Sequence, residues 1–111
     1  MAPVIHIVLF QFKKEQTEQQ RQALNDKMLG LRFKCIHPTS KEPYIKSSIG
    51  GMDNSIEGMQ HGATHAFIVE FESVQDRDYY VNEDPAHSAF VKEVLQSLDK
   101  ATILDFSPGV F

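Results

Sequence analysis

The fold is indicated most directly by residues 4–12, which read Val4-Ile5-His6-Ile7-Val8-Leu9-Phe10-Gln11-Phe12. In a β-strand, alternate side chains point to opposite faces of the sheet. One face then carries His6, Val8, Phe10 and Phe12, and the other carries Ile5, Ile7, Leu9 and Gln11. Both sets are largely apolar, which is typical of a strand covered on both faces. Because one layer of helices covers only one face, we expect a second subunit to cover the other, in a homodimer.

Capping residues, hydrophobic alternation and glycines predict the helices, strands and loops that follow this strand in the sequence. Thr17-Glu18-Gln19-Gln20 has the form of a capping box and predicts a helix of about four turns that ends near Leu31. Gly50-Gly51 is expected to stop a second strand, and 52–62 to form a surface loop. Further strands are expected over 44–49, 64–72 and 101–106, and helices over 74–81 and 85–98. This order predicts a single α+β domain, residues 1–111, of the ferredoxin-like type, with a four-stranded antiparallel sheet and helices on one face.

The amino-acid composition limits the classes of binding partner that we expect for this chain. The chain has 111 residues, of which 41% are hydrophobic and 23% charged, an ordinary balance for a globular protein. Its 11 basic and 15 acidic residues give a net charge of −4 and form no basic stripe, so we expect no nucleic-acid partner. The longest apolar run, 4–10, is too short to span a membrane and does not resemble a secretory signal. Because Cys35 is the single cysteine, we expect no internal disulfide and a cytoplasmic location.

A candidate catalytic residue lies at the start of the last helix. Asp84 is the expected N-cap and Pro85 the first helical residue, which places His87 in the first turn. The positive end of the helix dipole disfavours a second positive charge, so we expect a lowered pKa and a neutral imidazole that can act as a base. Tyr80 is the candidate partner, with Tyr79 as the alternative. The plainer interpretation is a structural histidine that packs under the sheet and donates a hydrogen bond to a backbone carbonyl.

Two further histidines, His6 and His65, lie on apolar strand faces. If the first and third strands are neighbours, these two side chains approach each other near one pocket. None of the three inward histidines has the short His-x-x-x-His or Glu-x-x-His spacing of a metal site, so we expect no metal. The sequence also lacks a phosphate-binding glycine loop, a dinucleotide-binding pattern and a Ser-His-Asp arrangement, and we expect no cofactor.

Four segments resemble the stress-responsive dimeric A/B barrel (Dabb) proteins, and they occur in the family's order across nearly the whole chain. They are residues 4–10, Thr64-His65 with the strand that ends in Phe71-Glu72-Ser73-Val74, the helix start Pro85-Ala86-His87, and the closing Asp105-Phe106-Ser107-Pro108. Members of this family are homodimers whose two sheets pack together in a barrel. The resemblance therefore implies a dimeric α/β barrel, in agreement with a first strand that is apolar on both faces.

The polyketide-cyclase members of this family imply roles for individual residues. By this resemblance the site residues are His87 as catalytic base, Tyr80 (or Tyr79) as its partner, and His6 and His65 on the strands. Two departures from those members stand out: the loop before the last helix is longer by a residue, and Asp84 replaces another histidine. The longer loop can shift the tyrosine away from the base, and the lost histidine alters the polarity of the pocket mouth.

Two functions remain open. The first is a cofactor-independent enzyme with an apolar pocket between sheet and helices for a small apolar carbonyl or polyketide-like compound. In that enzyme, an aldol-type cyclase, lyase or isomerase, His87 removes an acidic C–H proton and the Tyr80 hydroxyl stabilises the enolate. The expected pocket residues are His6, His65, Val8, Phe10, Leu24, Met28, Phe67 and Tyr79. The second function is that of a stress-response or ligand-binding protein without chemistry, whose interior is filled by the same apolar side chains.

Overall fold

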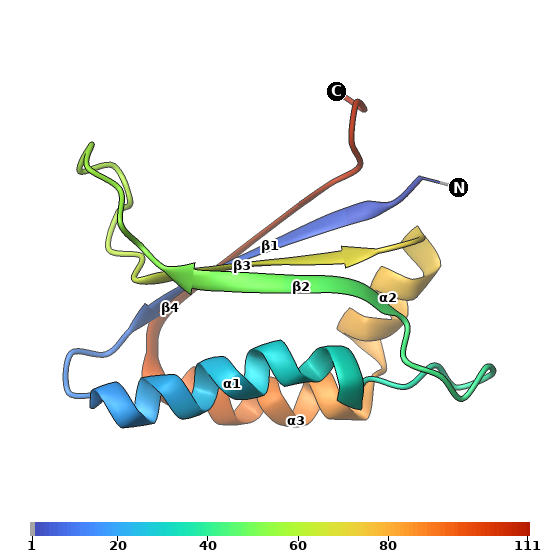
Figure 1. Cartoon of the computed structure of the whole chain (residues 1–111), viewed down its shortest axis with the longest axis horizontal. Coiled ribbons are helices and arrows are strands. Elements are labelled where there is room, and N and C mark those ends of the chain that lie inside the picture. Colours follow the sequence, from blue (N-terminus) through green and yellow to red (C-terminus); the bar gives the residue numbers. More distant parts are fainter. Residues whose placement is uncertain (1) are drawn as a thin grey trace.

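The computed structural model describes residues 2–111 and shows one antiparallel sheet with helices packed on one face (Figure 1). Its elements are β1 (Val4–Phe12), α1 (Glu18–Lys34), β2 (Ile45–Met52), β3 (His65–Phe71), α2 (Val74–Asn82), α3 (Pro85–Val94), a short 3-10 helix (Leu95–Ser97) and β4 (Leu98–Phe106). The strand order is β2-β3-β1-β4, and every neighbouring pair is antiparallel. The predicted α+β ferredoxin-like fold is confirmed. No helix within the described residues is long and apolar enough to cross a membrane.

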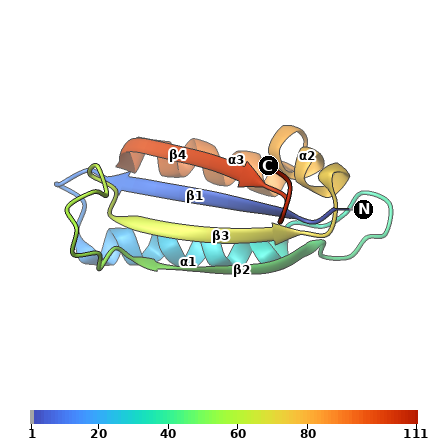
Figure 2. The ribbon, with the colours of Figure 1, turned by 90° about the horizontal axis from the view of Figure 1, so that it is seen from above.

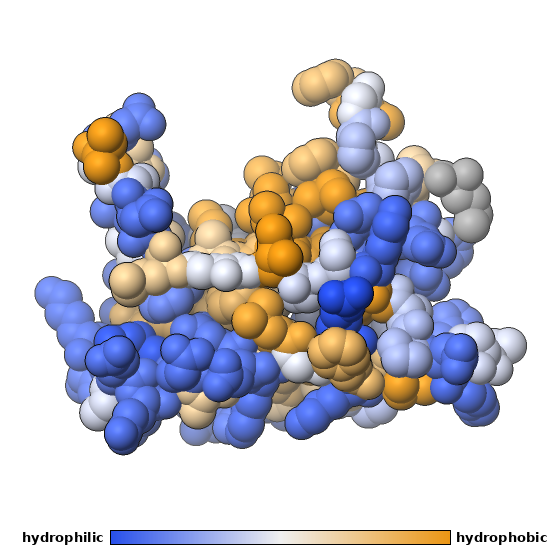
Figure 3. Space-filling model, viewed as in Figure 1, coloured by the Kyte–Doolittle hydropathy of each residue, from blue (hydrophilic) through white to orange (hydrophobic). Residues whose placement is uncertain are grey.

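The two faces of β1 meet different surroundings. On the helix side the strand buries His6, Val8, Phe10 and Phe12. The other side of the sheet faces the viewer in Figure 2, and no helix within residues 2–111 covers it. Cross-strand pairs place an apolar set of side chains there, which we call the apolar open face: Ile5, Ile7, Ile49, Ile68, Leu104 and Phe106. Figure 3 shows hydrophobic residues on this side, between the loop after β2 and the segment after β4.

The helix starts are those predicted from capping residues. In α1 the Thr17 hydroxyl accepts a hydrogen bond from the Gln20 backbone N–H at 3.1 Å, and the Gln20 side chain accepts one from the Thr17 N–H at 2.8 Å. In α3 the Asp84 carboxylate accepts a hydrogen bond from the Ala86 N–H at 2.9 Å. Asp84 is therefore the N-cap, and His87 lies in the first helical turn as expected.

Asp84 also joins α3 to two other elements. It is 2% exposed, and its second carboxylate oxygen accepts a hydrogen bond from the hydroxyl of Tyr44, just before β2, at 2.5 Å. Burial and the same carboxylate raise the pKa of the Cys35 thiol, at the end of α1. Burial and the hydrogen bond to Asp84 likewise raise the pKa of Tyr44, so its hydroxyl stays protonated and remains a donor. The start of α3 is thus tied by a hydrogen bond to the residue that precedes β2.

β2 runs further than the sequence predicts. The expected strand stop at Gly50-Gly51 is wrong, because both glycines pair with β3, Gly50 opposite Phe67 and Gly51 opposite Ala66. An ideal Cβ at Gly50 would lie 2.2 Å from a ring carbon of Phe67, whereas a Cβ at Gly51 would meet nothing within 4 Å. Gly50 therefore makes room for the Phe67 ring inside a continuous strand.

The last strand begins at Leu98, earlier than the predicted residue 101. α3 ends at Val94, and the 3-10 helix leads directly into β4, where Leu98 pairs with Phe12 of β1. Leu98 continues the helical spacing of the apolar residues before it, but it is buried as a strand residue. Apolar periodicity alone does not distinguish the two arrangements at the end of a helix.

We expect Gly50→Ala and Gly51→Ala to affect stability in opposite directions. At position 50 the new methyl group overlaps the Phe67 ring, and we expect a loss of about 1–3 kcal/mol in the free energy of unfolding. At position 51 the methyl group meets open space, and the reduced entropy of the unfolded chain should give a gain of up to about 1 kcal/mol. Urea denaturation measures both values. Equal stabilities would show that the Phe67 contact does not require the glycine.

Replacement of Asp84 removes two hydrogen bonds at once. We expect Asp84→Ala to lower the free energy of unfolding by about 2–4 kcal/mol, more than the cost of an N-cap alone, because the Tyr44 hydroxyl also loses its partner. Tyr44→Phe removes only the second bond and should cost about 1–2 kcal/mol. The double variant should cost less than the sum of the two. Urea denaturation gives the free energy of unfolding of the wild type, the two single variants and the double variant. Strictly additive losses would argue against an energetic coupling between Asp84 and Tyr44.

Candidate functional site

The structure brings together Tyr80 of α2 and His87 in the first turn of α3. Their rings stack with centroids 3.9 Å apart and an angle of 29° between the planes. Tyr80 is 1% exposed, and His87 is half-buried. Tyr79 points elsewhere, with its ring centroid 5.6 Å from that of Tyr44 and 6.2 Å from that of His37. Tyr80, and not Tyr79, therefore lies against His87.

His6 extends this pair into a group of three rings, which we call the ring cluster: His6, Tyr80 and His87. The His6 ring lies edge-on to Tyr80, with centroids 5.8 Å apart. His6 Nδ1 lies 2.6 Å from one oxygen of Asp105 on β4, and the other oxygen of Asp105 accepts a hydrogen bond from Arg77 of α2 at 2.9 Å. Because an ionised carboxylate can only accept, Nδ1 donates in this bond.

The sequence did not identify Asp105 or Arg77 as site residues. His6 and Asp105 are cross-strand partners that lie 99 positions apart in the chain, so their contact depends on the register between β1 and β4. Two sequence features are consistent with a role for them in the site. Alternation along the strand 101–106 places Asp105 on the same face of the sheet as Ala101. Arg77 lies three positions before Tyr80, on the same side of the helix.

Burial sets the protonation of the ring cluster. Burial is the largest cause that lowers the pKa of His87; nearby His6 acts in the same direction, while the Tyr80 backbone and Asp84 oppose it. This is the direction predicted from the helix position of His87, although burial rather than the helix dipole is its main cause. Burial also raises the pKa of Tyr80, so its hydroxyl stays protonated. A neutral imidazole beside a protonated phenol can accept a proton and donate a hydrogen bond.

The side chains expected to line an interior pocket are packed against one another. This buried set comprises Val8, Phe10, Leu24, Met28 and Phe67. His65 is also buried, but it pairs with Phe10, whereas His6 pairs with Val69. Four residue positions along a strand correspond to about 13 Å, so the two histidines do not approach each other as expected. His65 instead lies edge-on to Phe12, with ring centroids 5.1 Å apart.

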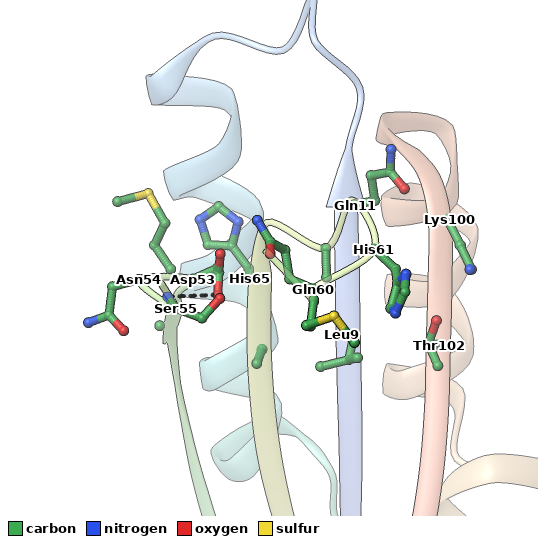
Figure 4. A pocket seen from close by; sticks show the side chains of 15 residues that line it. Leu9, Gln11, Asp53, Asn54, Ser55, Gln60, His61, His65, Lys100 and Thr102 are labelled. Carbon is green, nitrogen blue, oxygen red and sulfur yellow. Dashed lines mark hydrogen bonds between the residues drawn. The ribbon is translucent and has the colours of Figure 1, made fainter. Parts of the chain in front are cut away.

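Open pockets lie elsewhere on the molecule. One of about 610 Å³ lies on the uncovered side of the sheet, beside the loop between β2 and β3 (Figure 4), and another of about 340 Å³ lies beside His37 and Tyr44. Neither is lined by His87 or Tyr80, and His65 is the one expected pocket residue that borders the first. The ring cluster therefore borders neither of these two pockets. Residues 2–111 contain no group of three or more His, Cys, Asp or Glu side chains placed to hold a metal ion.

Two known plant proteins are similar to nearly the full length of this chain. The stress-response A/B barrel domain-containing protein HS1 of Arabidopsis thaliana is 33% identical over 106 residues, which cover 96% of this chain and 90% of that protein. Olivetolic acid cyclase of Cannabis sativa is 31% identical over 107 residues, which cover 95% of this chain and 96% of the cyclase.

Solved structures share the fold. A crystal structure of an Arabidopsis thaliana protein matches with a TM-score of 0.83 and 31% identity, covering 97% of each chain. A ferredoxin-like protein of Thermobifida fusca, described as dimeric, matches with a TM-score of 0.73 and 17% identity, covering 96% of this chain and 91% of its own. Residues 4–108 match the family described as Stress responsive A/B Barrel Domain. The chain belongs to this stress-responsive A/B barrel (Dabb) family.

Proposed function

We propose that this protein is a homodimer that binds a small apolar carbonyl or polyketide-like compound at the ring cluster, with His87 as a base. The observation that carries this proposal is the stacked pair of His87 and Tyr80, in which burial favours a neutral imidazole and a protonated phenol. Similarity to olivetolic acid cyclase over nearly the whole chain supports a cyclase-type reaction for this protein. We place the protein in the cytoplasm, because its one cysteine is a free, buried thiol.

The proposed reaction needs two protein groups and no cofactor. The neutral imidazole of His87 removes an acidic C–H proton next to a carbonyl of the bound compound. The Tyr80 hydroxyl donates a hydrogen bond to the carbonyl oxygen, where negative charge develops as the enolate forms. The enolate carbon then attacks a second carbonyl of the same compound, and the proton held by His87 passes to the new alkoxide. A lyase or isomerase reaction would use the same first step.

A ligand reaches the ring face of His87 that Tyr80 covers only if the ring cluster opens. The Tyr80 ring covers one face of the imidazole, and the buried apolar side chains around it are packed together. We therefore propose that the ligand takes the place of one ring against the other, at the junction of α2 and α3. Ligand binding would then depend on how stably α2 packs against the rest of the domain.

The closed interior favours a second candidate, a stress-response or ligand-binding protein without chemistry. In that case Tyr80 and His87 are packing residues, and the lowered pKa of His87 is mainly a consequence of burial. The two candidates differ in one measurable property. An enzyme of the proposed kind accelerates proton exchange at an acidic carbon, whereas a binding protein does not.

Hydrogen–deuterium exchange at the acidic carbon of a 2-alkyl-1,3-diketone, followed by NMR in D₂O, tests the proposed base. We expect the protein to accelerate this exchange and His87→Gln to lose about 10²–10⁴-fold, the usual contribution of a general base. Tyr80→Phe keeps the ring and removes the hydroxyl, and should lose about 10²–10³-fold. The matched control is Lys92→Gln, an exposed position of α3, which should retain the wild-type rate. A wild-type protein that leaves the exchange rate unchanged would exclude the enzyme and leave the second candidate.

The proposed homodimer rests on the apolar open face, which the single helical layer does not cover. Proteins described as dimeric occur among the solved structures of this fold, from Thermobifida fusca and from Jannaschia. Isologous packing of two such faces removes the same apolar surface from water on both subunits. We therefore propose that the two sheets pack against each other, as in the barrel for which the family is named.

Ile7→Asp should disrupt the dimer. Ile7 pairs with Ile68 on one side and Leu104 on the other, in the middle of the apolar open face, where a buried unpaired charge is costly. The matched control is Ile56→Asp, because Ile56 lies in the loop after β2 and is 97% exposed. We expect light scattering at micromolar concentration to show a dimer for the wild type and for Ile56→Asp, and monomers or aggregates for Ile7→Asp. A well-folded, monodisperse wild-type monomer would contradict the proposal.

A further inference from the structure

We propose that the pocket beside the β2–β3 loop holds residues 107–111 of the partner subunit, a segment that we call the β4 extension (Figure 4). Each subunit then places its β4 extension in the pocket of the other, and the two β1 strands run in opposite directions. This inference rests on the homodimer proposed above, and it adds which end of one sheet meets which end of the other. The pocket is thereby part of the interface and is closed to small molecules.

The β2–β3 loop and the β4 extension both project from the uncovered side of the sheet, at its opposite ends (Figure 1). The pocket lies at the loop end, where Leu9 on its floor pairs with Ala66 of β3 and Thr102 of β4. β4 runs from there to the other end, where its last residue, Phe106, pairs with Ile5 of β1. A β4 extension therefore leads away from the pocket of its own subunit. A second sheet laid on the apolar open face in the opposite direction brings its β4 extension to that pocket.

The loop that forms one side of the pocket is held in place within a single subunit. The Thr64 N–H donates a hydrogen bond to the Phe10 carbonyl at 2.7 Å, and the Asp53 N–H donates one to the Thr64 carbonyl at 2.8 Å. Gly62 has a φ of +85°, and a Cβ there would lie 2.7 Å from the side-chain oxygen of Gln11. Glycine allows both this backbone conformation and this close approach. The pocket, of about 610 Å³, is therefore formed before a partner arrives.

The β4 extension leaves the sheet through a tight turn. The Val110 N–H donates a hydrogen bond to the Ser107 carbonyl at 3.1 Å, and Gly109 has a φ of +80°. Proline followed by a glycine of positive φ, here Pro108 and Gly109, is typical of a type II turn. The turn directs the chain off the line of β4, on the uncovered side of the sheet (Figure 1). The direction in which the β4 extension points is thus set by its own sequence.

Apolar side chains of both segments lack cover within one subunit. In the β4 extension Val110 is 69% exposed and Phe111 is fully exposed, and in the pocket lining Met52 and Met59 are also exposed. Methionine side chains are flexible and adapt to the shape of a partner. Contact between the two segments removes all four side chains from water, which favours association. Ile56 does not line the pocket and stays outside this contact.

Charge distinguishes this orientation from the alternative, in which the two loops meet at one end and the two β4 extensions at the other. Residues 52–62 carry the carboxylates of Asp53 and Glu57 and no lysine or arginine, so contact between two copies of the loop brings like charges together. The β4 extension has no charged side chain. The pocket lining contains the ammonium group of Lys100 as well as the Asp53 carboxylate, and so has no excess of either charge from these two groups. An uncharged, apolar peptide segment suits this pocket better than a second loop.

Short cross-links between introduced cysteines test which ends of the two sheets meet. We expect bis-maleimidoethane to join two subunits of Met59→Cys/Val110→Cys into a covalent dimer on a denaturing gel. The single variants Met59→Cys and Val110→Cys should not be joined, because two copies of one position then lie at opposite ends of β1, roughly 30 Å apart for nine residues. The matched control is Met59→Cys/Lys92→Cys, since Lys92 is exposed on α3, on the other side of the sheet. Cys35 is buried and is common to all variants.

A tryptophan at position 110 gives a second readout, because the chain contains no tryptophan. We expect Val110→Trp to emit at shorter wavelength than Ile56→Trp, and the added change Ile7→Asp to remove this difference as the dimer dissociates. The exchange is overturned, and the homodimer kept, by a dimer in which the double cysteine variant is not joined, a single cysteine variant is joined, or the two tryptophans emit alike. A monodisperse wild-type monomer in light scattering contradicts the homodimer itself, and the exchange with it.

Discussion

The structure depends first on the alternation of apolar side chains along β1, which lies between β3 and β4. One set of its residues is buried by the helices, and the other is left on the uncovered side of the sheet. A slip of the register by one residue would exchange the sets, so that His6 would leave the ring cluster and Leu9 would enter the interior. The helical layer, the apolar open face and both proposed sites therefore follow from one strand.

The position of His87 depends on a buried carboxylate. A carboxylate removed from water is costly unless it is fully hydrogen-bonded, and Asp84 accepts bonds from the Ala86 N–H and the Tyr44 hydroxyl. These bonds fix where α3 begins relative to β2, and so fix the height of His87 above the sheet. The resemblance to the polyketide cyclases led us to expect a change of polarity at an open pocket mouth. At 2% exposure, Asp84 is instead a structural residue beneath the surface.

Local sequence patterns predicted those features of the structure that depend on residues adjacent in the chain. The caps of α1 and α3 and the helical position of His87 follow from a few adjacent side chains, and all three agree with the structure. Tyr79 and Tyr80 point about 100° apart on a helix, so only the packing of α2 on the sheet determines which one meets His87. Contacts set by strand register were not predictable in this way. The pairing of His6 with Asp105, the reason for Gly50 and the pocket beside the β2–β3 loop all require the positions of other strands.

Whether His87 can act as a base depends on the mobility of α2 rather than on the fold. α1 is held by three buried side chains, Leu24, Met28 and Leu31, whereas α2 has nine residues and buries Tyr80 alone. The main additional tie of α2 to the sheet is the bond from Arg77 to Asp105, which is partly exposed to water. Elements with few buried contacts open at low free energy, and a ligand that binds the open form shifts the population towards it. The side chain that covers one face of His87 therefore belongs to the α-helix with the fewest buried side chains.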